Sequence, residues 1–354
     1  FFTTKSEGHG LGLGLSTVGV PGGRTGEDVI AALQAGPRVA YAEPVYTRRA
    51  LALPAPNEPT WNVLDPTPDI NTREGEPLPA EYQLPYMWCL EIMNGPAAWD
   101  IWPSTYYTSA TKPANAIKVA VIDTGCDITH EDFRNGGATG EATQGGQLDL
   151  VNARNFVVRD VEGNPAPLVG DPVGHGTFCS GLIAASANNG GPASPLGGAV
   201  GLAFGAQVLP LQVLDNSQTG LVDDLIDGII WAVDHGARVI SLSLGEYTYS
   251  QAEQEAVDYA WSRGVLVVAA AGNDGVANGG QNRTTWPAAC NHVMAVGATA
   301  PWDQAASYSN TGSYLGIAAP GGDLFMDITF DDDGFPIIIY TQYGAWSAFP
   351  NAAS

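Results

Sequence analysis

Between residues 118 and 297 the hydrophobic positions fall into short continuous runs, separated by segments in which they recur with helical spacing. A continuous apolar run of a few residues is typical of a strand that is covered on both faces, as the strands of parallel sheets are. We therefore predict strands at 118–122, 207–213, 238–244, 265–271 and 293–297.

The segments between these runs predict amphipathic helices. One apolar face is formed by Leu221, Leu225, Ile229, Ala232 and Val233. Gly236 is placed to end that helix. Ser250 and Glu253 carry a capping-box signature for the next helix, which Gly264 is placed to end. Strands that alternate with helices in this way predict the α/β class, with a doubly wound parallel sheet.

The beginning of the chain has a different pattern. Residues 9–47 predict a small α+β unit, with a strand within 11–20, a helix from Thr25 to Gly36 that has its first residue as N-cap, and a second strand at 38–42. Residues 49–86 are rich in Pro, Asn and Glu and have no sustained period. Such a composition is typical of a linker or an extended surface arm.

Charge and hydropathy exclude some function classes. The chain has 37 acidic and 14 basic residues, and its net charge of −23 would repel nucleic acid. A soluble acidic surface explains this charge most simply, while bound calcium or a salty habitat also fit it. No apolar run reaches the length of a membrane span. The chain begins at Phe1 without a charged-then-apolar leader, so a secretion signal is expected to have been removed or to lie outside this sequence.

Cys89, Cys126, Cys179 and Cys290 form no C-x-x-C pair, so a zinc cage is not expected. The sequence does not choose among the possible disulfide pairings. A disulfide and a free buried thiol beneath the nearby His175 are both open.

Polar residues follow three of the predicted strands. Asp123 ends the first run, Ser243 and Gly245 lie at the end of the third, and Asn273 follows the fourth. The carboxyl ends of parallel strands meet at one edge of the sheet, where ligands bind. We therefore expect these residues to share that edge.

His175 stands between two glycines, just before the small-residue run 180–185 that is expected to form a helix. From the start of that helix it can reach the same edge as Asp123. An aspartate and a histidine placed in this way are the base half of a nucleophilic triad. Each motif alone is an ordinary turn, but their joint order and placement indicate an enzyme.

These motifs resemble those of the subtilisin-like serine proteases, the subtilase family (peptidase S8). The resemblance covers about residues 96–321. It is carried by Val119-Ala-Val-Ile-Asp123-Thr-Gly, Gly174-His175-Gly-Thr177, Ser241-Leu-Ser-Leu-Gly245, Val267-Val-Ala-Ala-Ala-Gly-Asn273, the segment 288–298 and Ala318-Ala-Pro-Gly321. It implies a subtilisin-like α/β fold and serine endopeptidase activity on polypeptide substrates.

The resemblance implies three catalytic roles. His175 would be the general base, since an imidazole titrates near neutrality. Asp123 would fix its tautomer and stabilise the imidazolium. Asn273 would donate its side-chain amide to the oxyanion.

The resemblance also implies how substrate binds. Ser243, Leu244 and Gly245 would pair with an extended peptide, which adds to them as a strand. Ala270 and Gly272 would line the pocket for the residue before the cleaved bond.

The family's nucleophile is a serine in a Gly-Thr-Ser-Met-Ala-like helix start after Ala318–Gly321. Only Ser347 and Ser354 follow that segment here, Ser313 precedes it, and none of them fits. We expect a fragment that ends before its nucleophile and forms no acyl-enzyme as written. The alternative is a catalytically silent relative that binds peptides without cleavage. A sugar- or nucleotide-binding protein has no support, because no strand–G-x-G-x-x-G–helix unit is present.

By the same resemblance, residues 1–48 are the C-terminal part of an inhibitory propeptide that acts within the chain. Residues 49–95 are a linker and N-terminal arm, and residues 96–354 are the C-terminally truncated catalytic domain. The implied cofactor is structural calcium, with Glu58, Asp132 and Asn189 at ligand positions. The acidic run 331–333 is expected to be a solvated turn rather than a second ion site. The protein is expected to be secreted, and a monomer is the default.

Overall fold

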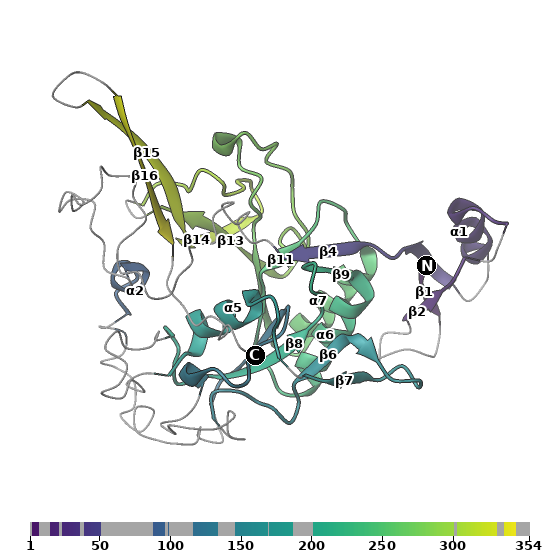
Figure 1. Ribbon diagram of the computed structural model, residues 1–354. Helices are drawn as coiled ribbons and strands as arrows, with labels where there is room; N and C mark the ends of the chain where they lie inside the picture. The colour runs from purple at the N-terminus through teal and green to yellow at the C-terminus, as the bar shows by residue number, and fades with distance from the viewer. Residues whose placement is uncertain are drawn as a thin grey trace.

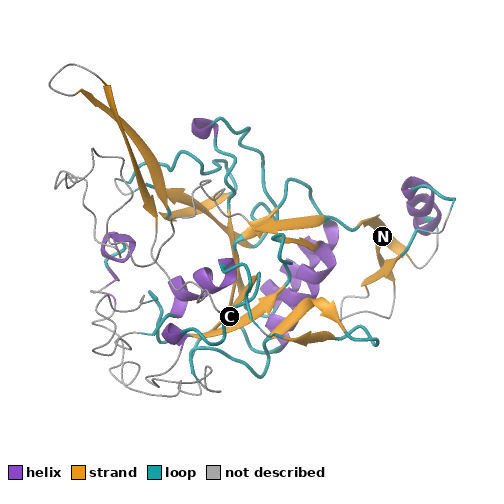
Figure 2. Cartoon of the chain, viewed as in Figure 1, coloured by secondary structure: helices purple, strands orange, loops and turns teal. Residues whose placement is uncertain are grey.

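The computed structural model (Figures 1 and 2) describes most of the predicted catalytic domain and much of the region before it. The described residues are 2–6, 15–20, 23–35, 39–50, 88–95, 98, 116–133, 146–168, 170–186, 201–300, 303–330 and 336–344. No helix in these ranges combines the length and the apolar character needed to cross a membrane.

An eight-stranded sheet forms the centre of the molecule, in the order β14-β13-β12-β10-β5-β8-β6-β7. Every neighbouring pair is parallel except β6 and β7. The strands are β5 (Lys118–Asp123), β6 (Arg154–Arg159), β7 (Pro165–Pro167), β8 (Gln207–Gln212), β10 (Val239–Leu242), β12 (Leu266–Ala270), β13 (Val293–Thr299) and β14 (Leu315–Pro320).

All five predicted strands are present in this sheet, with one correction. The run 238–244 does not stay in one strand: β10 ends at Leu242, and Leu244–Gly245 form a separate strand, β11. The strands β6, β7 and β14 were not predicted. They lie toward the two edges, where much of each strand faces solvent and long apolar runs are not needed.

Helices cover both faces of the sheet, as the doubly wound class requires (Figure 2). On one face, α6 (Val222–Asp234) and α7 (Gln251–Ser262) pack in a core that includes Ala120 and Ile122 of β5. On the other, α5 (His175–Ala184) packs in a core that includes Val119 and Val121. Alternate residues of β5 thus serve two cores, which explains its continuous apolar run.

The predicted helix ends need two corrections. Leu221 is not on the buried face of α6: it is the extended N-cap residue, and it is 44% exposed. The Ser250 hydroxyl accepts a hydrogen bond from the Glu253 backbone N–H, as predicted, but the Glu253 carboxylate pairs with Arg48 instead of completing the capping box. Gly236 and Gly264 follow their helices with left-handed φ angles of 82° and 73°, as glycine stops should.

The N-terminal unit is a three-stranded antiparallel sheet in the order β2-β1-β3 with one helix. Its elements are β1 (Phe2–Ser6), β2 (Leu15–Val18), α1 (Gly26–Gln34) and β3 (Val39–Pro44). Thr25 caps α1, as predicted, through reciprocal hydrogen bonds with Asp28. Strand β1 was not predicted, since its short sequence is mostly polar.

A second small sheet joins the N-terminal region to the main domain. Strand β4 (Thr47–Ala50) lies between β11 and β9 (Thr219–Leu221) and pairs with both in antiparallel fashion. Figure 1 shows β4 leaving the N-terminal unit and running beside β11. The first residues of the predicted arm 49–86 therefore belong to a strand, and the predicted boundary at residue 48 falls inside it; residues 51–86 lie outside the described part.

Three further elements lie outside these sheets, besides the short 3-10 helices η2 (Glu131–Phe133) and η3 (Val276–Asn278). The short helix α2 (Trp88–Ile92) precedes the main domain. The hairpin of β15 (Gly322–Phe330) and β16 (Pro336–Gly344) projects from the sheet end that carries β14 (Figure 1). The predicted acidic turn at 331–333 falls between these strands, outside the described residues.

Candidate active site

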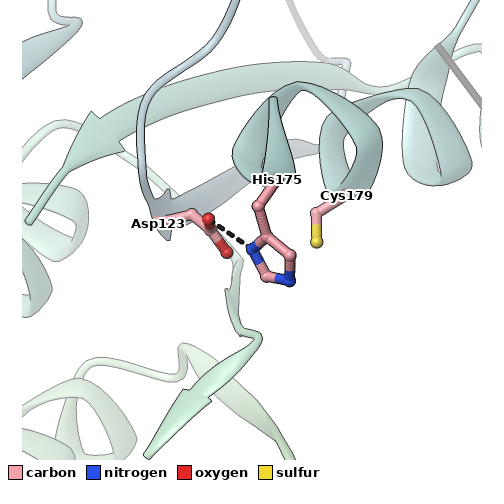
Figure 3. Close-up of side chains that lie close together, drawn as sticks. All are labelled: Asp123, His175 and Cys179. Atoms are coloured by element: carbon pink, nitrogen blue, oxygen red, sulfur yellow. Dashed lines mark hydrogen bonds and ion pairs between the residues drawn. The ribbon is translucent and has the colours of Figure 1, made fainter. Parts of the chain in front are cut away.

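Asp123 and His175 are in direct contact, as the sequence predicts (Figure 3). Asp123 is the last residue of β5 and is buried, while His175 is the first residue of α5. The Nδ1 atom of His175 lies 2.7 Å from Oδ1 of Asp123, which also accepts a hydrogen bond from the Thr124 backbone N–H. The second ring nitrogen points away from Asp123 (Figure 3), and the imidazole is 14% exposed. That nitrogen is therefore available to a reacting group.

Glycines explain why the strand end and the helix start can meet so closely. A Cβ atom on Gly176 would lie 2.2 Å from the carbonyl oxygen of Gly125, and one on Gly125 would lie 2.4 Å from that of Gly170. Gly174, the N-cap of α5, has a left-handed φ of 93°. A side chain at Gly125 or Gly176 would push neighbouring backbone segments apart, and one at Gly174 would be strained by the left-handed φ. The glycines of both motifs thus position the pair rather than react.

A buried carboxylate that sequence analysis missed, Asp171, ties the two segments together. It accepts hydrogen bonds from the Thr124 hydroxyl at 2.9 Å and from the Thr177 hydroxyl at 2.6 Å. It also accepts from the backbone N–H groups of Gly174 and Thr177. The one sequence signal for this role is Asp171 at the start of an Asp-x-x-Gly turn, where aspartate side chains commonly bond the backbone.

The surroundings of His175 change its titration. Burial lowers the pKa of the imidazole, but the charge and hydrogen bond of Asp123 and the charge of Asp171 oppose this effect. The net result is a pKa raised above the ordinary value of 6.5. The site therefore favours the imidazolium, the form a general base acquires when it removes a proton.

Cys179 lies one helical turn beyond His175 (Figure 3). Its thiol donates a hydrogen bond to the Ser243 hydroxyl at 3.4 Å, and burial raises the pKa of the thiol well above its ordinary value. All four cysteines are free and buried, which decides between the two alternatives in favour of thiols. Asp123, His175 and Cys179 are the one close cluster of potential metal ligands within the described ranges, but a protonated thiol is a poor ligand.

The other predicted residues share the edge of the sheet with this pair. Strand β10 lies between β5 and β12, so Ser243 follows a strand adjacent to the one that ends at Asp123. Strand β12 lies on the other side of β10. It ends at Ala270, and Gly272 and Asn273 follow it. Leu244 and Gly245 are buried, while Ser243 and Asn273 are half-buried. The structure thus brings the predicted residues together; their roles remain predictions.

The loop that carries Asn273 is held by a second residue that sequence analysis missed, Asn310. Its backbone N–H donates to the Gly272 carbonyl at 3.0 Å, and its side-chain oxygen accepts from the Asp274 N–H at 2.6 Å. Its side-chain amide donates to the Thr285 hydroxyl. Gly272 has a φ of 108°, and a Cβ there would lie 2.6 Å from the Asn310 amide nitrogen. No local pattern at residue 310 signals this contact.

The predicted substrate-pairing strand β11 already has a partner, β4. Leu244 lies opposite Ala50 and Gly245 opposite Arg49. The N-terminal region also caps two helices of the main domain. Glu43 accepts hydrogen bonds from the Ser250 hydroxyl and from two backbone N–H groups at the start of α7, and the Tyr46 carbonyl accepts from the Val222 N–H at the start of α6. Carboxylate and carbonyl oxygens are what helix N-termini require.

Of the three residues predicted to bind calcium, the structure places Asp132. It lies in the short 3-10 helix η2 (Glu131–Phe133), is buried, and accepts a hydrogen bond through its carbonyl from the Ser186 N–H at 2.7 Å. Glu58 and Asn189 lie outside the described residues. A carboxylate oxygen is a ligand that a hard cation accepts, so Asp132 is compatible with the predicted calcium site.

The sequence is similar to those of several characterised proteins. Residues 114–348 match the sequence model of the subtilase family, Peptidase S8. The thermophilic serine proteinase of Bacillus sp. (strain AK1) is 34% identical over 303 residues, which are 86% of this chain and 60% of that protein. Thermitase of Thermoactinomyces vulgaris is 35% identical over 233 residues, 66% of this chain and 69% of thermitase. The major intracellular serine protease of Bacillus subtilis (strain 168) is 35% identical over 213 residues, 60% of each chain. The chain thus spans about three fifths of the length of two of these relatives.

Proposed function

Because the chain belongs to the subtilase family, we propose that the complete protein is a serine endopeptidase that cleaves polypeptides at the sheet edge where β5, β10 and β12 end. The observation that carries this proposal is the 2.7 Å hydrogen bond between His175 and Asp123 at that edge. The raised pKa of His175 supports it, because both neighbouring carboxylates stabilise the imidazolium.

In the proposed mechanism, His175 takes the proton of a serine hydroxyl through its second ring nitrogen while the serine oxygen bonds to the substrate carbonyl carbon. The carbon–nitrogen bond then breaks, and the amine leaves with that proton. In the second half, His175 takes a proton from water while the water oxygen bonds to the acyl carbon. The ester bond to the serine then breaks, and the serine oxygen regains a proton from His175. Asp123 stabilises the imidazolium, and the Asn273 amide donates to the oxyanion. Loss of one such donor typically costs about 10²–10³ in kcat, a magnitude known from subtilisin itself.

The serine is assigned to the family's Gly-Thr-Ser-Met-Ala-like segment and to no residue of this chain. Ser347 and Ser354 lie outside the described residues, and Ser313 precedes β14, away from the elements that carry Asp123 and His175. Tests of activity therefore use the complete gene product.

We further propose that the N-terminal region acts as an intramolecular inhibitor. Strand β4 lies along β11, where an extended substrate would pair, and Glu43 and Tyr46 fix it against the starts of α7 and α6. A peptide cannot form the same backbone hydrogen bonds with Leu244 and Gly245 while β4 holds them.

The proposed cofactor is a structural calcium ion, held by the Asp132 carboxylate together with Glu58 and Asn189. When bound, it would supply positive charge that ties the loop after β5 to other segments. We expect a chelator to lower the melting temperature of the wild-type protein. Compared with a sample that contains calcium at a hundred times its Kd, the free energy of unfolding should fall by about 2.7 kcal/mol. Asp132→Asn should remove most of that calcium effect, and an unchanged effect in this variant would contradict the assignment.

We propose that the protein is secreted and works as a monomer. Secretion follows from the family resemblance, although the relatives include a protease named as intracellular, and the monomer is the default assumption. Cell fractionation and size-exclusion chromatography with light scattering test them.

The central test replaces His175 by Ala in the complete gene product and follows hydrolysis of an unfolded protein such as reduced casein. We expect kcat to fall by about 10⁴–10⁶, as for loss of a triad base. His292→Ala is the matched control, because this exposed histidine pairs with Asp258 on the surface. Persisting activity in His175→Ala would refute the assigned base. A wild-type protein that binds peptides at β11 but cleaves none would instead identify the catalytically silent relative.

A further inference from the structure

Arg48 is a fully buried charged side chain of β4. It lies in the middle strand of the β11-β4-β9 sheet and is 0% exposed. Its Nε and Nη2 atoms donate to the two carboxylate oxygens of Glu253, both at 2.7 Å, and Nη1 donates to the Thr47 carbonyl. This fork-to-fork geometry is the strongest and most directional form of an ion pair.

Stability alone does not explain such a pair. Removing two charges from water costs about as much as their attraction returns, so an apolar pair of similar volume would stabilise the fold at least as well. Glu253 lies in the first turn of α7, in the main domain, whereas Arg48 belongs to the N-terminal strand. Burial raises the pKa of Glu253, and the neighbouring Arg48 opposes that rise. The Glu253 carboxylate thus lies buried beneath β4, where its two oxygens hold a guanidinium.

Strand β4 shows how an extended peptide lies on β11. In its register Ala50 faces Leu244, so the next residue of a bound peptide would reach the level of Ser243. The Ser243 hydroxyl touches the thiol of Cys179, beside His175. A peptide in this register therefore runs toward the Asp123–His175 pair.

The same register places the basic side chain relative to the cleaved bond. Ser243 follows β10, and the neighbouring strand β12 ends at Ala270, two residues before Gly272. By the family resemblance, Ala270 and Gly272 line the pocket for the residue before the cleaved bond. The peptide residue at the level of Ser243 is then the one that enters this pocket. Arg48 is three residues earlier, which is the fourth residue before the bond.

We propose that Glu253 is a specificity-determining residue that selects substrates with arginine at the fourth position before the cleaved bond. This inference rests on the proposed endopeptidase function. In the chain's own sequence the pattern is Arg48-Arg49-Ala50-Leu51, so the bond between Leu51 and Ala52 is the corresponding processing site.

Arginine is favoured over other side chains by its shape and charge. Its planar guanidinium matches both carboxylate oxygens at once, whereas lysine offers a single charged point. Leucine at this position would leave Glu253 buried without a cation. Sites built around a buried polar group discriminate strongly against partners that cannot satisfy it, and we expect a preference of about 10² or more.

The experiment measures kcat/KM of the complete protein on internally quenched peptides that differ only at this position, with Arg, Lys, Leu or Glu. Mass spectrometry locates each cut. We expect Arg to exceed Leu by about 10² and Lys to fall between them. Glu253→Gln should reduce the preference for Arg, and the double variant Arg48→Leu/Glu253→Leu should reverse it while filling the site with apolar groups. Glu255→Gln, on the same helix, is the control and should keep the wild-type preference.

Each outcome has a definite meaning. Cleavage of all four peptides at similar rates, or a preference for Arg that survives Glu253→Gln and the double variant, would overturn the inference while leaving the endopeptidase function intact. A folded protein that cleaves no peptide would overturn the function and the inference with it. As a second measurement, N-terminal sequencing of the processed protein should give Ala52 as the first residue, and another N-terminus would contradict the register.

Discussion

The end of β5 and the start of α7 each hold a buried carboxylate against a nitrogen base, but the two pairs are built differently. Asp123 and His175 are 52 residues apart, and Arg48 and Glu253 are 205 apart. An imidazole gains and loses its proton near neutrality, so the first pair can move a proton. A guanidinium stays charged at any accessible pH, so the second pair can bind a side chain but cannot transfer a proton. The same physical element, a carboxylate under a cation, serves chemistry in one place and selection in the other.

The largest expected effect comes from removing the negative charge of Asp123 in the first pair. In the complete protein, Asp123→Asn should lower kcat by about 10⁴, because the neutral amide no longer stabilises the imidazolium or fixes its tautomer. Steady-state hydrolysis of a quenched peptide measures the effect. Asp258→Asn is the control, since this exposed carboxylate makes a surface ion pair with His292. A loss of less than tenfold for Asp123→Asn would show that Asp123 does not act through His175.

Removing the cation of the second pair should affect stability rather than proton transfer. Arg48→Leu leaves Glu253 buried without its partner and should lower the free energy of unfolding by about 3–5 kcal/mol, while Arg48→Leu/Glu253→Leu should recover most of it. Urea unfolding followed by tryptophan fluorescence measures both. Arg263→Leu, at the exposed end of α7, should change stability by less than about 0.5 kcal/mol.

The pH dependence of the Arg48→Leu variant sharpens this result. Burial already raises the pKa of Glu253, and loss of Arg48 removes an opposing effect. A group with a raised pKa in the folded state binds its proton more tightly there, so folding gains stability as pH falls. The variant should therefore lose less stability at pH 5 than at pH 7.5. Equal losses at both would indicate that Glu253 is not the group left unpaired.

The smallest expected effect comes from Asp171, which links both segments of the first pair. Asp171→Asn should cost about 1–3 kcal/mol of stability, because a carboxylate that accepts several buried hydrogen bonds is replaced by a group that also donates. Its charge raises the pKa of His175, so the variant should lower that pKa. Histidine NMR titration of the 354-residue chain checks the shift, and the rising limb of the activity profile should move to lower pH with it. A merely structural role would leave the titration unchanged.

The sequence predicted the first pair because its determinants are local. A short apolar run predicted the end of β5, and the order and placement of the Asp123 and His175 motifs predicted that the two residues share one edge of the sheet. The close backbone contact between their glycines was seen only in the structure. The edge strands β7 and β14 were missed because they need no long apolar run. Asn310 and Arg48 act on partners far away in the chain, and no period or motif encodes such a contact. Glu253 was recognised only as a capping residue, a local role that its ion pair with Arg48 displaced.

Strand β4 holds backbone hydrogen bonds on both of its sides, to β11 and to β9. It is tethered to the domain that it covers, and a tether of this kind acts like a millimolar concentration of competitor. A single cut behind the strand would end the tether but leave the hydrogen bonds to β11 and β9 and the Arg48–Glu253 pair in place, so the severed segment would still cover β11. We expect the proposed protease to become active only after the freed segment is itself degraded. Its activity would then appear after a lag, and each active molecule would degrade the bound segments of others.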